Sequence, residues 1–455
     1  MFLGLGIGIW AFIAYISFIL FWNLIAKRKI CEAMMIGWLI VCLFNGLGKL
    51  PDALVKSFLS GTKTSSCLSP ILFVGMAALM EQTGIIGRLI DILNSLLGRL
   101  RGGPAYISVL ASALMGLISG STAANAATVG SITIPWMRQT GWSASVASIM
   151  NSGNAGLGVS LPPSTSMFMM LGFADVAAYV TTGDVYMTVL TTGIYGIIYR
   201  LFVVFCYVRK YHIEALDASE VPNFWQTMQE KFSALIIFVG VLIPLAITAG
   251  PLATVLKAIA SFGKKGVAAI DIIIWVPVLI IFGVLFEGRN YLPKNKEDAA
   301  KFCKKLSKSF FNVAPVIMFA MCGSDALRAI GFGRDVTTFM SSLGLSSIMT
   351  IIAVALVVEC VVGPLNASAA TTALGTVCFL TMVSVGVVPA VAVAVFLMLV
   401  SNQGAIPPSS SAIYISCGIS GAEVTSTFRA CLFHYAIPTA CIAVLVALGI
   451  LPVVY

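Results

Sequence analysis

The sequence predicts an all-α polytopic membrane protein with inverted structural repeats, two re-entrant hairpins and two broken helices. Composition gives the first indication: the 455 residues are 59% hydrophobic and 10% charged, whereas soluble domains carry about 25% charged residues. Apolar runs close to the roughly 20 residues needed to cross a bilayer recur along the whole chain. The third indication is a pair of related segments, one in each half, in which small and polar residues interrupt the apolar sequence.

Apolar segments follow one another through the first half. Lys27, Arg28 and Lys29 follow the first span, and a basic flank of this kind stays in the cytoplasm. We expect spans at 3–25 and 31–48, a Ser/Thr-rich loop at 57–69, apolar segments at 68–82, 104–119, 122–137 and 142–158, a short piece after Pro162-Pro163, and a long span at 184–208.

The second half begins after a polar stretch at 209–231. The basic segment 289–308 has periodic Phe302, Leu306, Phe310 and Phe311, which predicts an amphipathic helix on the membrane surface. We expect apolar segments at 232–260, 268–286, 309–324, 346–362, 367–385, 388–402, 408–418 and 429–451. The predicted domains are scaffold helices at 1–60, a first repeat at 61–208, a connecting scaffold segment at 209–308 and a second repeat at 309–455.

An internal repeat relates the two halves. Residues 119–166 and 363–411 each open with Gly and small residues that include an asparagine, Asn125 or Asn366, and each continues with Ala-Ala-Thr. About 35 residues later each reaches Pro-Pro-Ser, preceded by Asn154 or Asn402. Gly, Ala, Ser and Thr are also enriched wherever membrane helices pack closely, but the shared order and spacing favour a repeat.

These interruptions predict a binding site. Backbone that leaves a helix at membrane depth is tolerated only where it is buried in protein or lines a wet cavity, and paired breaks point to the binding site of a secondary transporter. Helix N-termini attract anions, and freed carbonyls with Ser, Thr and Asn oxygens suit a hard cation such as sodium. The candidate substrate- and ion-binding residues are Ser119, Gly120, Ser121, Thr122, Asn125, Thr128, Asn151, Asn154, Pro162, Pro163, Ser164, Glu359, Gly363, Asn366, Ser368, Thr371, Asn402, Pro407, Pro408 and Ser409.

Other classes of site fit the sequence poorly. The net charge of +9 comes from short basic clusters between apolar runs, so it indicates topology and not nucleic-acid binding. The 11 cysteines include no C-x-x-C, and His212 and His434 are the only histidines, which argues against zinc or haem. No HExxH motif and no GxSxG motif with a partner histidine is present, so we expect no enzyme activity.

The sequence resembles the large membrane subunit of the TRAP (tripartite ATP-independent periplasmic) transporters. The runs GIIGRLID (84–91) and GRLRGG (98–103) are similar to that family's segment ahead of its first hairpin. GLISGSTAANAATVGSITIP (116–135) is similar to the hairpin, GLGVSLPPS (156–164) to the following broken helix, and SCGISG (416–421) to the segment after the second Pro-Pro.

This resemblance implies a function and partners. It implies a multi-pass protein of the bacterial inner membrane that moves a small organic anion, typically a carboxylate, by an elevator mechanism coupled to sodium. It also implies a periplasmic or extracellular substrate-binding protein and a small four-helix membrane subunit. The sodium would lie near Ser121, Asn125, Asn366 and Ser368. The family usually carries acidic residues where this chain has Asn125 and Asn366, so two negative charges are missing from those sites.

Ionisable residues within spans are candidates for function. Glu359 precedes Asn366 by seven residues, and we hypothesise that it supplies the missing charge or carries a proton. The alternative is a carboxylate near the helix end that reaches the interface or pairs with an arginine. Asp325 and Arg328 are three residues apart, which favours a structural pair on one helix face. Two alternatives to a TRAP permease remain: a stand-alone ion-coupled carboxylate symporter, and a receptor or scaffold without transport.

Overall fold

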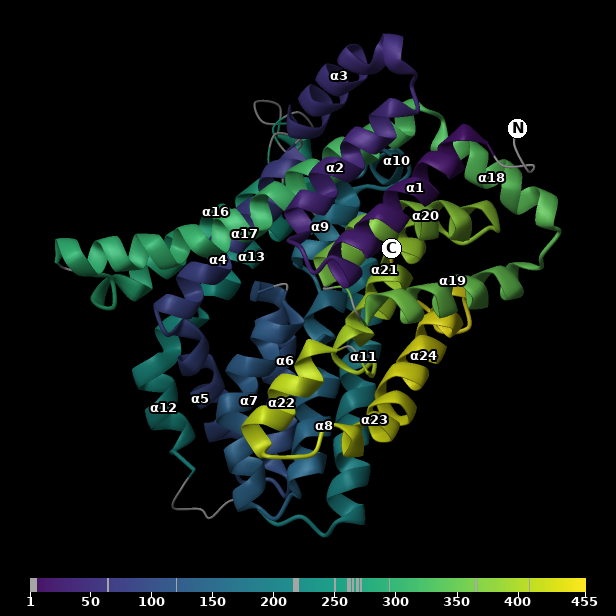
Figure 1. Cartoon of the computed structure of the whole chain (residues 1–455). Coiled ribbons are helices and arrows are strands. Elements are labelled where there is room, and N and C mark those ends of the chain that lie inside the picture. The colour runs from purple at the N-terminus through teal and green to yellow at the C-terminus, as the bar shows by residue number, and fades with distance from the viewer. Residues whose placement is uncertain are drawn as a thin grey trace.

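The computed structural model describes residues 6–63, 65–119, 121–215, 221–248, 251–259, 263, 266, 270, 272–293, 295–363, 365, 367–408 and 410–455. The described residues form helices joined by short turns and contain no β-strand (Figure 1). By length and composition, four described helices could cross a membrane, or up to six if each of two bent helix pairs is one span. The predicted all-α fold with several shorter embedded helices is therefore confirmed.

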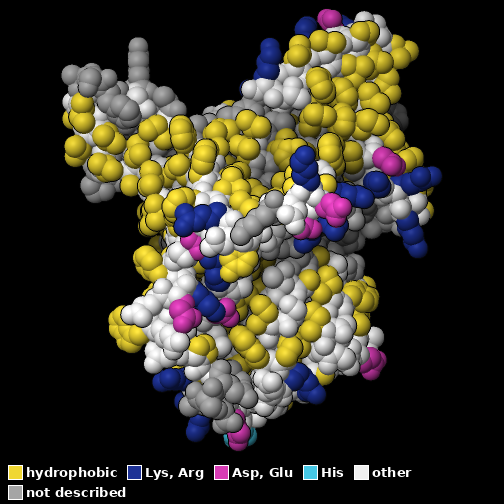
Figure 2. Space-filling view, turned by 90° about the vertical axis from the view of Figure 1, so that its left-hand side faces the viewer, with side chains coloured by type: hydrophobic (Ala, Val, Ile, Leu, Met, Phe, Trp, Pro, Cys, Tyr) yellow, Lys and Arg dark blue, Asp and Glu magenta, His cyan; other side chains and the backbone are white. Residues whose placement is uncertain are grey.

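Long apolar helices make up one part of the molecule, which we call the frame. Its helices are α1 (Ile7–Leu20), α2 (Ile30–Leu43), α3 (Leu50–Lys63), α4 (Ser65–Gln82), α13 (Ile236–Thr248), α14 (Pro251–Ala258), α16 (Ile272–Glu287) and α17 (Lys296–Ala329). The helix α17 packs against α2, α3 and α4, and α16 packs against α4 and α13. Hydrophobic side chains cover much of the upper part of the face in Figure 2, with charged side chains in a band below them. This pattern fits a surface in contact with lipid.

Two expectations about the frame are wrong. The Ser/Thr-rich stretch at 57–69 is not a loop, because α3 continues to Lys63 and α4 begins at Ser65. The hydroxyls of Ser57 and Thr62 bond to the preceding turn of their own helix, to the carbonyls of Ala53 and Phe58, each at 2.6 Å. The basic segment is also not a separate surface helix, because its residues from Lys296 onward run without interruption into the apolar segment as α17. The domain boundary placed at 308/309 thus falls inside one helix.

The second part, the hairpin body, contains the repeated elements. In the first repeat, α6 (Gly103–Ser119) and α7 (Thr122–Gln139) form a hairpin, and α8 (Ala144–Asn154), a 3-10 turn at Leu157–Ser160 and α9 (Thr165–Gly172) form a broken helix. The short α10 (Ala174–Ala177) and the long α11 (Thr182–Lys210) follow. Both Pro-Pro bonds, at Pro162-Pro163 and Pro407-Pro408, are cis.

The second repeat has the same order of elements. Its hairpin is α19 (Ser347–Val362) with α20 (Ala367–Ser384), and its broken helix is α21 (Pro389–Val400), a 3-10 turn at Ser401–Gly404 and α22 (Ser411–Ser420). It ends with α23 (Thr425–Cys431), a π-helical turn at Leu432–Ala436 and α24 (Ile437–Ala447). The two hairpins and two broken helices predicted from the sequence are therefore present.

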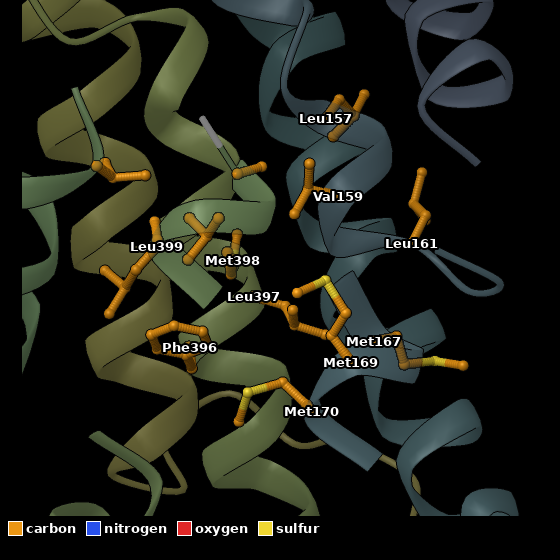
Figure 3. Close-up of a cluster of buried hydrophobic side chains, with 14 of the residues drawn as sticks. Leu157, Val159, Leu161, Met167, Met169, Met170, Phe396, Leu397, Met398 and Leu399 are labelled. Carbon is orange, nitrogen blue, oxygen red and sulfur yellow. The ribbon is translucent and has the colours of Figure 1, made fainter. Parts of the chain in front are cut away.

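The core of the hairpin body lies where the two repeats meet. Figure 3 shows apolar side chains around the first break, among them Leu157, Val159 and Met169, beside those of α21, among them Phe396 and Met398. These five side chains are at most 2% exposed. Packing at this density holds the two broken helices in a fixed relation to each other.

Two amphipathic helices were not predicted as helices. The helices α5 (Ile85–Leu97) and α18 (Phe332–Leu343) each directly precede a hairpin. Each begins after a glycine in the left-handed region, Gly84 with φ +67° and Gly331 with φ +87°. The short α12 (Phe224–Lys231) packs against α5. We call α5 and α18 the arms, since they join the frame to the hairpin body.

Charged side chains of both arms contact neighbouring helices: α12 and α16 in the case of α5, and α1 in the case of α18. In α5, Asp91 accepts from Lys231 at 2.6 Å, and Arg88 forms an ion pair with Glu287 of α16. In α18, Asp335 accepts from the backbone N–H of Gly8 at the start of α1 at 2.7 Å, where the helix dipole favours a negative charge. The equivalent attachment of both arms extends the repeat beyond the hairpins.

Candidate functional site

The two breaks touch each other at the centre of the hairpin body. A Cβ on Gly156 would lie 1.9 Å from the carbonyl oxygen of Ser401, and a Cβ on Gly404 would lie 2.4 Å from that of Ser152. No side chain fits at such distances, so only glycine allows the two backbones to approach this closely. Glycines separated by almost 250 residues therefore bring the two predicted sites into one place.

Asn125 links the first hairpin to the first broken helix. Its side-chain nitrogen donates to the carbonyls of Ser112 on α6 and Ala155 beyond α8, at 2.9 and 2.7 Å. Its Oδ1 is buried and has no hydrogen-bond partner within the described residues. The amide therefore joins two elements through its nitrogen and keeps its oxygen available, whereas an ionised aspartate could not donate to either carbonyl.

Asn151 and Asn154 on α8 repeat this arrangement. Asn151 donates to the carbonyl of Ala126 at 2.9 Å and to Ser416 Oγ of the second repeat at 2.8 Å. Asn154 faces Ser108 Oγ at 3.4 Å. Both residues are fully buried, and both Oδ1 atoms lack a partner in the described part of the chain.

Buried acceptors without partners are unusual in native proteins, and each one needs a physical explanation. Here Oδ1 of Asn125, Asn151 and Asn154 and Oγ1 of Thr122 are of this kind, and all belong to the first hairpin and α8. Neutral amide and hydroxyl oxygens are suitable ligands for a hard cation. Within the described residues no group of three or more His, Cys, Asp or Glu could hold a metal ion.

The starts of the two outer half-helices carry further free hydroxyls. Thr165 and Ser166 open α9, and Ser410 directly precedes α22; all three are at most 2% exposed, and their hydroxyls have no partner in the described structure. Ser164 caps α9 by accepting from the N–H of Met167 at 3.2 Å. Helix N-termini with spare hydroxyls suit an anionic group. The sequence pattern pointed to Ser164 but not to these three residues.

In the second repeat, Asn402 and Glu359 come together. Asn402 is fully buried, and its Nδ2 donates to Glu359 Oε1 at 2.6 Å and to the carbonyl of Ala436 at 3.0 Å. The two side chains come from the 3-10 turn of the second break and from α19 of the second hairpin. Two residues that the sequence marked separately are thus in direct contact.

The other predicted residues are more scattered. Thr371 is buried, but its hydroxyl donates to the carbonyl of Ala367. Ser121 is exposed and caps α7, and Pro162 and Pro163 line an apolar cavity of about 190 Å³. Thr128, Ser368 and Pro407 are half-buried, Gly363 is buried, and Pro408 is exposed. Gly120, Asn366 and Ser409 lie outside the described residues, as does the side chain of Ser119.

Arg200 is a buried cation that the sequence analysis missed, because it lies on α11 outside the two repeated segments. It is fully buried, and its Nε donates to the carbonyl of Gly153 at 3.2 Å, at the C-terminal end of α8. A positive charge at a helix C-terminus is favourable. An arginine within an otherwise apolar span is the signal that could have identified it.

One ion pair connects the frame to the hairpin body. Arg328 does not pair with Asp325 as predicted; its Nε lies 3.6 Å from Oδ1 of Asp175 on α10. A cavity of about 380 Å³ lies beside this pair, between α3, α9, α10 and α17. The hairpin body and the frame therefore meet through this ion pair beside a cavity, and through apolar packing of α9 against α4, where Phe73 and Phe168 stack.

The family model described as "Tripartite ATP-independent periplasmic transporter, DctM component" matches residues 3–453. The C4-dicarboxylate TRAP transporter large permease protein DctM of Pseudomonas aeruginosa is 23% identical over 402 residues, which is 87% of each chain. The ectoine TRAP transporter large permease protein TeaC of Halomonas elongata is 25% identical over 206 residues, 45% of each chain. The chain spans less than half the length of TeaC and of YgiK of Salmonella typhimurium, which is 29% identical over 43% of this chain and 46% of its own.

Two solved structures have a similar fold. MtrF of Neisseria gonorrhoeae, from a class of antimetabolite efflux pumps, has a TM-score of 0.63 and 16% identity, over 90% of this chain and 86% of its own. The YdaH transporter of Alcanivorax borkumensis has a TM-score of 0.64 and 16% identity, over 89% of both chains. The family match over nearly the whole chain, with this fold, shows that the protein belongs to the DctM component family of TRAP transporters and is a multi-pass protein of the inner membrane.

Proposed function

We propose that this chain is the large permease of a TRAP-type transporter that moves a small organic anion, a carboxylate, across the inner membrane with sodium as the coupling ion. The observation that carries the proposal is the crossing of the two breaks at Gly156 and Gly404, surrounded by buried oxygens without partners. Paired breaks at one place are the arrangement on which secondary transporters build their binding sites.

The two groups of free oxygens suggest different ligands. Oδ1 of Asn125, Asn151 and Asn154 would bind sodium, and neutral ligands leave its positive charge uncompensated by the protein. That charge would then favour a negatively charged substrate nearby. Thr165 and Ser410, at the starts of α9 and α22, would bind the carboxylate, because helix N-termini favour anions.

An elevator is the mechanism that the architecture supports best. The hairpin body has a closely packed core. It meets the frame through the Asp175–Arg328 pair beside a cavity at one end, and through apolar packing of α9 and α6 against α4. The arms α5 and α18 start at glycines with positive φ, where the chain can redirect without strain. A rigid body attached by two arms could move against the frame while its binding site stays intact.

We also propose that a substrate-binding protein and a small membrane subunit work with this chain, as the names of its relatives suggest. The test is uptake into proteoliposomes. The full chain would be reconstituted alone, with the small subunit, and with both partners, and a binding protein recovered by pull-down would be loaded with labelled C4-dicarboxylate or ectoine as the first probes.

Uptake that needs both partners and an inward sodium gradient is the expected result. Uptake by the chain alone would instead identify a stand-alone symporter. If the complete complex binds its probe but produces no flux under any gradient, the transport proposal is wrong and a receptor role is favoured. Asn151→Ala should weaken the sodium dependence, whereas Ser426→Ala, on the exposed part of α23, should leave it unchanged.

A further inference from the structure

Glu359 is a half-buried acidic residue of the hairpin body, and its carboxylate oxygen Oε2 is shielded from solvent. It lies about 18 Å along the axis of α19 from Ser347, at a rise of about 1.5 Å per residue, and four residues before Gly363 at the hairpin tip. Its Oε1 accepts from Asn402, and its Oε2 is buried with no hydrogen-bond partner among the described residues. An ionisable group in this position marks a functional site by default.

The elements that pack against α19 supply no counter-charge. They are α20, α21, α24 and the 3-10 turn Ser401–Gly404, and their described residues include no Lys, Arg, His, Asp or Glu. Their titratable groups are the thiols of Cys378 and Cys441, and Cys360 on α19 itself is exposed. A carboxylate here would therefore be a buried charge without an ion pair, which is strongly unfavourable.

The charged and titratable groups just beyond these elements already have other partners. His434 Nδ1 is bonded to the hydroxyl of Tyr207, and the hydroxyl of Tyr435 donates to the sulfur of Met150. Arg200, the buried cation of the hairpin body, binds the carbonyl of Gly153. None of these groups is bonded to Glu359.

The local geometry fits a proton better than a metal ion. Asn402 donates both N–H groups of its amide, one to Glu359 Oε1 and the other to the carbonyl of Ala436, and its buried Oδ1 has no hydrogen-bond partner among the described residues. The neighbouring Val358 and Val362 are fully buried apolar residues. A proton needs only one oxygen, Oε2, whereas a hard metal cation needs several oxygen ligands.

We infer that Oε2 of Glu359 is a proton-binding site and that the proton bound there is carried with the substrate. This inference rests on the proposed transport function and adds a second coupling ion to it. With the second hairpin open, the Glu359 carboxylate takes a proton from water. Closure against Asn402 then buries a neutral carboxylic acid. When the hairpin opens on the opposite side of the membrane, the O–H bond breaks and the proton returns to water.

Closure of the second hairpin thus depends on protonation of Glu359, and this dependence couples proton binding to substrate transport. A hairpin that closes over a charged Glu359 would bury an unpaired carboxylate, so the unprotonated hairpin body stays open and does not cross. A ligand that binds one conformation better shifts the equilibrium towards it, and here the proton is that ligand.

The first test is the melting temperature of the purified full chain across a range of pH. Glu359→Gln has the shape of the protonated acid but cannot ionise. The wild type should match Glu359→Gln at acidic pH and fall progressively below it as the pH rises. Glu297→Gln, which removes an exposed carboxylate from the first turn of α17, should show no such pH-dependent gap. A constant difference between the wild type and Glu359→Gln would overturn the inference.

The second test detects the proton directly. Infrared difference spectra are recorded on reconstituted protein in an Asp175→Asn background, which removes a second buried carboxyl. Between acidic and alkaline pH, the protein with the wild-type Glu359 should show the C=O stretch of a buried carboxylic acid. This band should be absent in Glu359→Gln. In Asn402→Leu, which loses the donor to Oε1, the pH at which the band appears should differ from that of the protein with Asn402. A band that persists in Glu359→Gln, or a protein with the wild-type Glu359 that lacks the band at every pH, contradicts the assignment.

The third test separates this inference from the transport function. In the uptake assay above, an inward proton gradient should stimulate the wild type and have no effect on Glu359→Gln, while both respond to sodium. Equal responses of both proteins to the proton gradient would refute proton coupling and leave sodium-driven transport standing. Absence of any flux would refute the transport proposal, and the melting and infrared results would then decide on the proton site alone.

Discussion

Asp175 of α10 and Arg328 of α17 form an ion pair that joins the hairpin body to the frame, with Nε and Oδ1 3.6 Å apart. The carboxylate is mostly buried, with 15% of its side chain exposed, whereas the arginine side chain is 52% exposed. Burial raises the pKa of Asp175, and Arg328 counteracts this only in part.

This arrangement predicts a pH-dependent effect of Asp175→Asn. Because the pKa of Asp175 is raised in the folded protein, the stability gained from its protonation is full at low pH and is lost as the pH rises through the raised pKa. The melting temperature of Asp175→Asn should therefore rise relative to the wild type with increasing pH. Asp52→Asn, which removes a carboxylate that is 79% exposed, should give no such trend. A melting temperature of the wild type that rises relative to that of Asp175→Asn with increasing pH would contradict this prediction.

The crossing of the two breaks predicts a strong effect of a single methyl group. Gly156→Ala places a Cβ 1.9 Å from a backbone oxygen of the other break, and overpacking typically costs about 1–3 kcal/mol. We expect a lower melting temperature and loss of uptake. Gly418→Ala in α22 meets nothing within 4 Å and should be neutral or stabilising by about 0.5–1 kcal/mol. Equal behaviour of the two variants would show that the breaks do not touch.

Asn125→Asp restores the charge that the family usually carries in the first hairpin, and we expect it to be harmful. The new carboxylate oxygen would face the carbonyls of Ser112 and Ala155 in place of two N–H donors. Each buried polar group left without its partner costs about 1–3 kcal/mol. The melting temperature should fall, and sodium should recover part of the loss if the cation binds here. A variant as stable as the wild type without sodium would show that Asn125 does not hold the hairpin through nitrogen.

Arg200 should be replaceable only by another cation. Arg200→Met leaves the carbonyl of Gly153 at the end of α8 without its donor, which costs about 1–3 kcal/mol. Arg200→Lys keeps the charge at the C-terminus of this helix and should recover most of the stability and uptake. If lysine and methionine give the same melting temperature and the same flux, the favourable interaction with the helix end is not the role of Arg200.

The sequence predicts the repeats well because their causes are local. Pro-Pro ends a helix wherever it occurs, and clusters of glycine and serine mark turns at membrane depth. The hairpins and broken helices follow from these residues. Glu359 stands out in the same way, as a lone acid in an apolar run.

Contacts between distant segments could not be predicted. Arg328 has Asp325 within reach on its own helix, yet its partner is Asp175 of α10 in the hairpin body. Asn402 is 43 positions from Glu359, and only the fold brings them together. The arms α5 and α18 were missed because a short amphipathic helix that starts at a glycine looks like a turn in sequence.

Movement of the hairpin body against the frame is the central element of the proposed transport, and distances between spin labels measure it most directly. One pair of labels would join Lys56 on α3 of the frame to Val388 at the start of α21, and a control pair would join Gln139 and Glu423 within the hairpin body. An elevator predicts that the first distance changes when sodium and substrate are added to the reconstituted complex, while the second stays constant. A fixed first distance together with a variable second one would contradict a rigid moving body.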